Sequence, residues 1–268
     1  MSAKREPKQL NGVRVCTQQL TSSMESASAE IALEPPDSGD FYESFAIPDG
    51  SGDIAILVGD VTGHGAHAAS KANSIRDAAV AKLKTGASPL ETVRAANAVS
   101  QTPDDRYATV FVARINGNTG DFRYANAGHE HPVVANTDRK DEQLETTGPP
   151  LGVVPAEMDL FEERTGHLDN ESTLVVTTDG ITEARKPNSP FPVFFGFDRF
   201  RSTIERIKKF SPGQIVQILI SRVLSFTRSV LSDDIVLMAV RRHTTTKTYA
   251  NERRTSSRKR GQRARITD

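Results

Sequence analysis

Residues 107–127 read YATVFVARINGNTGDFRYANA, and this stretch decides the fold. Two runs rich in β-branched and aromatic residues flank the segment GNTGD at residues 117–121. Gly, Asn and Asp at such a position are typical of a tight connection between antiparallel strands. The sequence therefore predicts a β-hairpin here and an antiparallel sheet around it.

Similar runs recur on both sides of this hairpin, bounded by Gly, Asn or Asp. They are GVRVCTQQL (12–20), SASAEIAL (26–33), DIAILVGD (53–60), HPVVAN (131–136), STLVVTTD (172–179) and DDIVLMAVRR (233–242). Helical periodicity appears over residues 66–83, over 88–100 after a Ser-Pro start, and again after Ser211 and Pro212. The order of elements predicts an α+β fold in which helices cover antiparallel sheets.

The composition bounds the class of protein. A chain of 268 residues can bury a core without disulfides, and its one cysteine, Cys16, excludes an intramolecular disulfide and a zinc-finger framework. A single cysteine favours a reducing compartment, so we expect a cytoplasmic location. The sequence has no apolar run of the ~18 residues needed to cross a membrane, and no signal peptide is evident at its start.

Charge divides the chain into unlike parts. The 34 basic and 34 acidic residues cancel overall, but residues 243–268 carry eight basic and two acidic residues, a net charge of +6. Residues 1–242 therefore carry −6. We interpret residues 1–12 as a flexible lead, 13–242 as one domain and 243–268 as a disordered basic tail. The tail suits a weak contact with nucleic acid or an anionic surface, or serves solubility alone.

Acidic residues stand where apolar strands end or turns begin. They are Asp40, Asp60, Asp179 and the pair Asp233 and Asp234. Several carboxylates at one rim of a sheet repel each other unless a cation neutralises them. Carboxylate and carbonyl oxygens suit Mg²⁺ or Mn²⁺ better than zinc. For any one aspartate alone, the alternative is an ordinary turn residue.

Five motifs in a fixed order resemble a known family. They are GDVTGHG (59–65), TVFVARINGNTGDFRYANAGHEHP (109–132), TTGPPLGV (146–153), TTDGITEA (177–184) and SDDIVLMAV (232–240). The chain resembles the SpoIIE-type branch of the metal-dependent protein serine/threonine phosphatases, the PPM or type 2C fold, over roughly residues 30–240. The resemblance implies a β-sandwich of two antiparallel sheets with helices on both outer faces. It also implies a site for two Mn²⁺ or Mg²⁺ ions at one end.

The resemblance assigns site residues one by one. The implied metal ligands are Asp40, Asp60 as the bridging aspartate, the backbone carbonyl of Val61, Asp179 of the TDG motif, and Asp233. Asp60 and Asp179 are implied to act in catalysis through a metal-bound water. Supporting or phosphate-side positions are Gly63, His64, Gly180 and Asp234.

The first motif departs from the family's Gly-Gly-Asp-aromatic-Tyr-Asp. Ser38 replaces its first glycine, and Glu43 replaces its last aspartate. Serine would be strained there if the backbone needs a positive φ, whereas glutamate keeps the charge on a longer arm. His64 lies four residues after Asp60, whereas eukaryotic members have a histidine two residues after it, so no general-acid role carries over.

Three further features leave alternatives open. His64, His67, His129 and His131 are a poor zinc pattern, and His129 is expected to be structural. Gly63 and Gly65 suit either anion binding at a helix start or a tight turn. The loop KPNSPFPVFFGF at residues 186–197 suits a flap, a docking surface, or a segment that packs its Phe side chains on the core.

The function implied by the resemblance is Mn²⁺- or Mg²⁺-dependent hydrolysis of phosphoserine or phosphothreonine. The implied substrate is a phosphorylated regulatory protein, an anti-sigma-factor antagonist in a partner-switching pathway that controls a sigma factor or stress response. The alternative is a weak or inactive phosphatase-fold module that binds a phosphoprotein. Loss of any of the four principal aspartates would favour that alternative, and all four are present.

Overall fold

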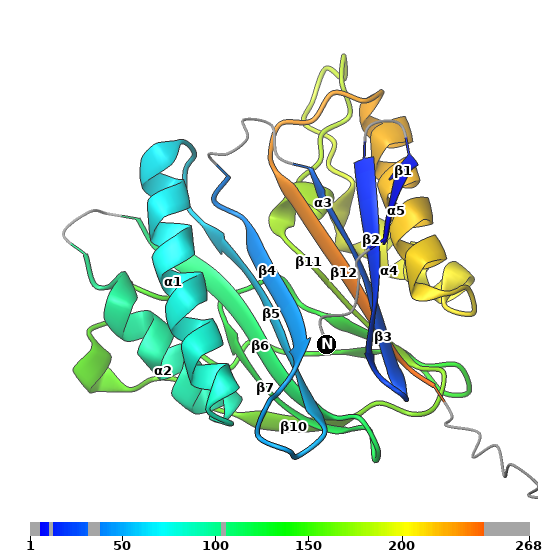
Figure 1. Cartoon of the computed structure of the whole chain (residues 1–268). Helices are drawn as coiled ribbons and strands as arrows, with labels where there is room; N and C mark the ends of the chain where they lie inside the picture. The colour runs from blue at the N-terminus through cyan, green and yellow to red at the C-terminus, as the bar shows by residue number, and fades with distance from the viewer. Residues whose placement is uncertain (1–5, 11–12, 32–37, 103–105, 244–268) are drawn as a thin grey trace, which may run out of the picture.

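The computed structural model describes residues 6–10, 13–31, 38–102 and 106–243. Its strands form two antiparallel sheets that pack against each other in a sandwich (Figure 1). The seven-stranded sheet has the order β1 (Glu6–Leu10), β2 (Val13–Thr21), β3 (Met24–Ile31), β12 (Ile235–Arg242), β11 (Thr173–Thr177), β8 (Val133–Ala135), β9 (Glu142–Gln143). The five-stranded sheet has the order β10 (Arg164–His167), β7 (Asp121–Ala127), β6 (Ala108–Asn116), β5 (Asp53–Val61), β4 (Phe41–Ala46).

Central strands of both sheets are buried on both faces, which explains their nearly unbroken apolar runs. Side chains alternate across a strand, so Ile54, Ile56 and Val58 of β5 face the other sheet, whereas Ala55 and Leu57 face outward. In β12, Val236, Met238 and Val240 likewise fill the space between the sheets.

Helices cover both outer faces, as the resemblance implied. Helices α1 (Ala66–Lys84) and α2 (Pro89–Ser100) pack on the five-stranded sheet (Figure 1). Helices α3 (Asp179–Thr182), α4 (Gly196–Ile207) and α5 (Pro212–Thr227) pack on the seven-stranded sheet. The expected cap of α2 is confirmed, because the Ser88 hydroxyl accepts the Glu91 N–H and the Glu91 carboxylate accepts the Ser88 N–H.

The α+β sandwich is confirmed, and so is the hairpin, which joins β6 to β7. Residues 6–10 form β1, within the segment 1–12 for which the sequence predicted a flexible lead. This edge strand has little apolar content and is held by backbone pairing with β2, so its composition gave no strand signal. Strand β4 and helix α4 were also not predicted. The tail beyond His243 lies outside the described residues. No helix among the described residues is both long and apolar enough to span a membrane.

Candidate metal and phosphate site

The predicted aspartates meet at one end of the sandwich because of strand direction. Asp40 directly precedes β4, and Phe41 pairs with Gly59, so Asp40 lies beside the end of β5 that carries Asp60. On the other sheet, β11 ends at Thr177, shortly before Asp179. Thr177 pairs with Leu237 near the start of β12, and Asp234 directly precedes that strand. Antiparallel pairing therefore places two acidic strand ends on each sheet at a shared edge.

A hydroxyl group joins the two halves of this site. Thr178 Oγ1 donates to Asp40 Oδ2 at 2.8 Å and accepts the backbone N–H of Val236 at 2.9 Å. The Thr178 N–H donates to the Val236 carbonyl at 3.0 Å. Asp40 of the five-stranded sheet is thus fixed to the backbone of β12 in the other sheet.

Two glycines permit close backbone approach at the site. A Cβ atom on Gly39 would lie 2.5 Å from the Val61 carbonyl oxygen and 3.4 Å from Asp60 Oδ1. A Cβ atom on Gly180 would lie 1.8 Å from the carbonyl oxygen of Asp234. The distances to the two carbonyl oxygens, 2.5 Å and 1.8 Å, are too short for a side chain. Gly39 therefore brings Asp40 to Asp60, and Gly180 brings Asp179 to the Asp233–Asp234 segment.

The pKa values of the clustered aspartates are raised by burial and by their mutual repulsion. Burial, then the charges of Asp233 and Asp234, raises the pKa of Asp60 to about 6. Burial, then Asp60 and Asp233, raises the pKa of Asp179 to about 7. Burial, followed by the charge of Asp60, also raises the pKa of Asp40 well above its usual range, and the hydrogen bond from Thr178 opposes this rise. The pKa values of Asp40, Asp60 and Asp179 are therefore each raised by burial first and by neighbouring carboxylates second.

The donor set fits a hard divalent cation. Its side-chain donors are carboxylate oxygens, with the Val61 carbonyl beside Gly39 as a backbone oxygen. Burial, and then the charge of Asp234, raise the pKa of Asp233, whereas the nearby His64 lowers it. In the described ranges, no three His, Cys, Asp or Glu side chains are already drawn together closely enough to hold an ion. The like charges lie near each other and would need a cation to come closer.

The remaining sequence-based positions have distinct places. Gly63 and Gly65 have φ values of 89° and 88°, so both make the tight turn between β5 and α1. His64 is exposed on this turn. Ser38 does not have a positive φ, so the departure from glycine causes no such strain, and its Oγ accepts the Asp40 N–H at 3.1 Å. The concern about Ser38 was therefore unfounded.

His129 is buried, which agrees with the structural role expected for it. Its Nδ1 lies 2.8 Å from Thr109 Oγ1, and its N–H donates to Asn126 Oδ1 at 2.8 Å. Burial lowers its pKa to about 3, so the imidazole is neutral at physiological pH.

Part of the loop at residues 186–197 packs its Phe side chains on the core, which was one of the three alternatives. Phe195 is buried and Phe197 packs against the core, whereas Phe191 is 76% exposed. Backbone hydrogen bonds between Lys186 and Val193 and between Ala184 and Phe195 close the base of this loop.

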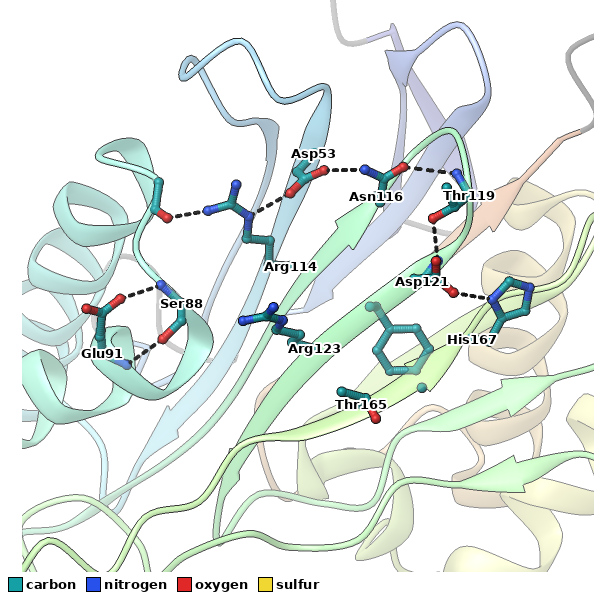
Figure 2. Close-up of a pocket in the computed structure, with 13 residues that line it drawn as sticks. Asp53, Ser88, Glu91, Arg114, Asn116, Thr119, Asp121, Arg123, Thr165 and His167 are labelled. Atoms are coloured by element: carbon teal, nitrogen blue, oxygen red, sulfur yellow. Dashed lines mark hydrogen bonds and ion pairs between the residues drawn. The ribbon is translucent and has the colours of Figure 1, made fainter.

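A separate cavity, whose lining Figure 2 shows, contains none of the predicted metal ligands. Its volume is about 1030 Å³, and it includes Asp53 at the start of β5, the opposite end of that strand from Asp60. Internal ion pairs fill much of its lining, such as Arg114 with Asp53 at 2.7 Å. A smaller pocket of about 280 Å³ contains Asp40, Ser38 and Glu43. The carboxylate cluster is the candidate site, because the larger cavity contains none of the predicted ligands.

Three residues near the site were not found from the sequence. Thr178 lies within the TTDG motif, yet its contact with Asp40 depends on how the sheets meet. Burial and the charge of Asp234 raise the pKa of Glu30, which lies on β3. Arg106 lies beside the turn after β5, with its Nε 3.6 Å from the Cβ position of Gly63.

Comparisons with known proteins identify a family and several relatives. The family model for stage II sporulation protein E (SpoIIE) matches residues 50–243. The chain is 29% identical over 237 residues to protein IcfG of Synechocystis sp., covering 77% of this chain and 36% of IcfG. It is 28% identical over 208 residues to the phosphoserine phosphatase RsbU of Bacillus subtilis, covering 76% of this chain and 59% of RsbU.

A solved structure shares the fold over most of the chain. The crystal structure of the RsbU and RsbW domains of Rv1364c from Mycobacterium tuberculosis has a TM-score of 0.70 and 25% sequence identity, covering 82% of this chain and 60% of that one. The chain thus spans about one third to three fifths of the length of these relatives. Because the family model matches well over half of the chain, the chain belongs to the SpoIIE family of PP2C-type serine/threonine phosphatase domains.

Proposed function

We propose that this chain hydrolyses phosphoserine or phosphothreonine on a regulatory protein, with two Mn²⁺ or Mg²⁺ ions as cofactors. One observation carries the proposal: four carboxylates from two sheets lie at one shared edge, where burial and then the charge of a neighbouring carboxylate raise the pKa of each. Clustered like charges at strand ends weaken a fold unless they serve a cation. The PPM family is metal-dependent, in agreement with this donor set.

The residues that would hold the ions are those implied by the family resemblance, namely Asp40, Asp60, the Val61 carbonyl, Asp179 and Asp233. When bound, the ions would supply Lewis acidity for an attacking water and for the charge that develops on the phosphoryl group. The chain itself fixes the ligands. Thr178 orients Asp40, and Gly180 allows the Asp234 backbone to reach α3. Gly63 and His64 on the turn after β5 would lie on the phosphate side.

The substrate proposal rests on relatives. RsbU is named a phosphoserine phosphatase, so phosphoserine on a protein is the substrate class that we propose here. We further propose an anti-sigma-factor antagonist in a partner-switching pathway and a cytoplasmic location. The inactive binding module is disfavoured because every principal aspartate is retained and sits at the shared edge.

Phosphate release with Mn²⁺, with Mg²⁺ and with EDTA tests the proposal. We expect hydrolysis of p-nitrophenyl phosphate and of phosphoserine peptides with either ion, and none with EDTA. Binding of Mn²⁺ by calorimetry without any phosphate release would instead support the binding module.

A further inference from the structure

Large apolar side chains are exposed unevenly on this protein. Nine are exposed among the described residues, and five of them belong to the end of α2, the start of β6 and residues 153–160. These five are Val99, Tyr107, Val153, Met158 and Leu160. We call this set the apolar shoulder. Such a concentration on one flank marks an interaction site more often than scattered exposed side chains do.

The apolar shoulder is a built surface whose segments are held to α2. The N–H of Gly152 donates to Asn97 Oδ1 at 2.9 Å, and Gln101 Nε2 donates to the Val154 carbonyl at 2.9 Å. Arg94 Nε donates to Asp159 Oδ1 at 2.6 Å, between Met158 and Leu160. Figure 1 shows residues 156–158 as a short helical turn beside α2. These apolar side chains are therefore displayed by fixed backbone.

The apolar shoulder continues into the candidate site. Leu151 and Ala108 exchange both backbone hydrogen bonds, at 2.7 and 3.0 Å, which joins residues 151–160 to the start of β6. Next to Ala108, Tyr107 and Thr62 exchange hydrogen bonds of 3.0 to 3.2 Å. Thr62 belongs to the turn that begins directly after Asp60 and Val61. Hydrogen bonds from Leu151 to Ala108 and from Tyr107 to Thr62 thus connect the apolar shoulder with the carboxylate cluster.

A cation marks the boundary between the two regions. The Arg106 side chain lies over Gly63, and the buried Lys71 of α1 donates its amine to the Arg106 carbonyl and, at 2.9 Å, to Thr102 Oγ1. Lys71 therefore fixes the backbone that carries Arg106. Guanidinium groups bind phosphate and carboxylate oxygens in a forked geometry, which suits an anionic residue that passes from the shoulder into the site.

We propose that the apolar shoulder docks the protein substrate, which would place an apolar surface on Val153 and Met158 while its phosphorylated residue enters past Arg106. This inference rests on the proposed phosphatase function. The occupant is a phosphoprotein because the shoulder adjoins the turn after Asp60 and because the cation at the boundary complements a phosphate. A membrane surface or a second copy of this chain would have no need for either feature.

The test compares substrates of different size on matched variants. The shoulder variant is the double substitution Val153→Ser and Met158→Ser. The control is Phe210→Ser, which removes a side chain of similar exposure (46%) from the turn between α4 and α5. The probes are p-nitrophenyl phosphate, a phosphoserine peptide with Leu- and Ile-rich flanks, and the same peptide with Gly and Ser flanks, all with Mn²⁺.

We expect the wild type to prefer the apolar-flanked peptide by about tenfold in kcat/KM, and the shoulder variant to lose that preference through KM. Both variants should hydrolyse p-nitrophenyl phosphate like the wild type. Arg106→Ala should raise KM for both peptides, and Arg106→Lys should restore part of the loss.

Two outcomes would overturn the docking proposal: equal peptide kinetics in wild type and shoulder variant, or a shoulder variant that changes only the oligomeric state or the binding to anionic vesicles. Failure of all proteins to hydrolyse p-nitrophenyl phosphate would instead contradict the proposed phosphatase function.

Discussion

The Thr178 hydroxyl donates to Asp40 at 2.8 Å while accepting the N–H of Val236 at 2.9 Å, and so connects the two sheets at the candidate site. Thr178→Val keeps the shape but removes both hydrogen bonds. It should weaken Mn²⁺ binding by about tenfold to a hundredfold, because Asp40 loses its orienting partner. It should also destabilise the protein by about 1–3 kcal/mol, since the buried Val236 N–H loses an acceptor.

Isothermal titration with Mn²⁺ and thermal unfolding check this prediction. Thr178→Ser retains the hydroxyl and should behave almost like the wild type. Thr165→Val, an exposed threonine in the remote cavity, is the matched control. Wild-type affinity in Thr178→Val would show that the Asp40 contact has no part in binding the ion.

Gly180 lies so close to the Asp234 backbone that no side chain fits there, a constraint that an ordinary Asp-Gly turn does not impose. Gly180→Ala would place a Cβ atom 1.8 Å from the Asp234 carbonyl oxygen, so α3 or the start of β12 must shift. We expect a loss of about 1–3 kcal/mol in stability and a fall in kcat. Gly213→Ala in the first turn of α5 is the control, because its new Cβ meets only a methyl group of Thr17 at 3.3 Å. Equal activity in the two variants would contradict the close-approach argument.

The sequence singled out Asp40, Asp60, Asp179 and Asp233 as candidates because each ends or precedes an apolar strand. That pattern is local, so it can be recognised without a structure. Thr178 and Glu30 could not be recognised in the same way. The part of Thr178 depends on the separation of the two sheets, and that of Glu30 on its pairing opposite Val236. Register and sheet packing are long-range properties, which a local pattern does not carry.

The success of secondary-structure prediction also depended on whether the signal was local. Strands β5 and β12 were predicted nearly to their ends, since burial on both faces makes their sequences distinctly apolar. Strand β7 is partly exposed, and it was predicted from the hairpin turn before it. Strand β1 is held by backbone pairing with β2, so composition did not reveal it. Helix α4 buries Phe200, Ile204 and Ile207 at helical spacing, but it begins within a Phe-rich stretch that was interpreted as a loop.

Asp179→Asn separates the carboxylate cluster from the larger cavity as the catalytic site. We expect activity with saturating Mn²⁺ to fall at least about a hundredfold, because the cluster loses a charged metal ligand. Asp121→Asn is the matched variant in the remote cavity, where Asp121 accepts a hydrogen bond from His167 (Figure 2). It should retain nearly full activity. Initial rates on p-nitrophenyl phosphate measure both, and the reverse pattern would move the site to the larger cavity.

Repulsion among the carboxylates should appear in the stability of the metal-free protein. The pKa values of Asp60 and Asp179 are raised to about 6 and about 7, so the folded state binds more protons than the unfolded state between about pH 4 and 7. The contribution of these groups to stability is therefore present at low pH and is lost as pH rises through 6 and 7. In EDTA, Asp179→Asn should unfold at a higher temperature than the wild type at pH 8, with a smaller difference at pH 5.

Mn²⁺ should reverse the order of the two unfolding temperatures at pH 8, so that the wild type becomes the more stable protein. Mn²⁺ neutralises the cluster, so the wild type should gain more in unfolding temperature than Asp179→Asn. Scanning fluorimetry at both pH values, with and without Mn²⁺, measures all four conditions. If the difference in unfolding temperature between the wild type and Asp179→Asn in EDTA is the same at pH 5 and pH 8, strong repulsion at Asp179 is excluded.

Removal of residues 244–268 tests the role of the basic tail. The cut should follow His243, because its imidazole contacts Glu25 at 3.0 Å and Glu171 at 3.4 Å within the folded domain. The removed segment carries all eight basic residues counted beyond residue 242. If the tail contacts anionic surfaces, the full chain should bind DNA or phosphatidylserine vesicles at low salt and release them as salt rises, and the shortened chain should not bind. Unfolding temperature and p-nitrophenyl phosphate hydrolysis should be unchanged by the cut. Equal weak binding by both chains would leave solubility as the role of the tail and place no anionic partner there.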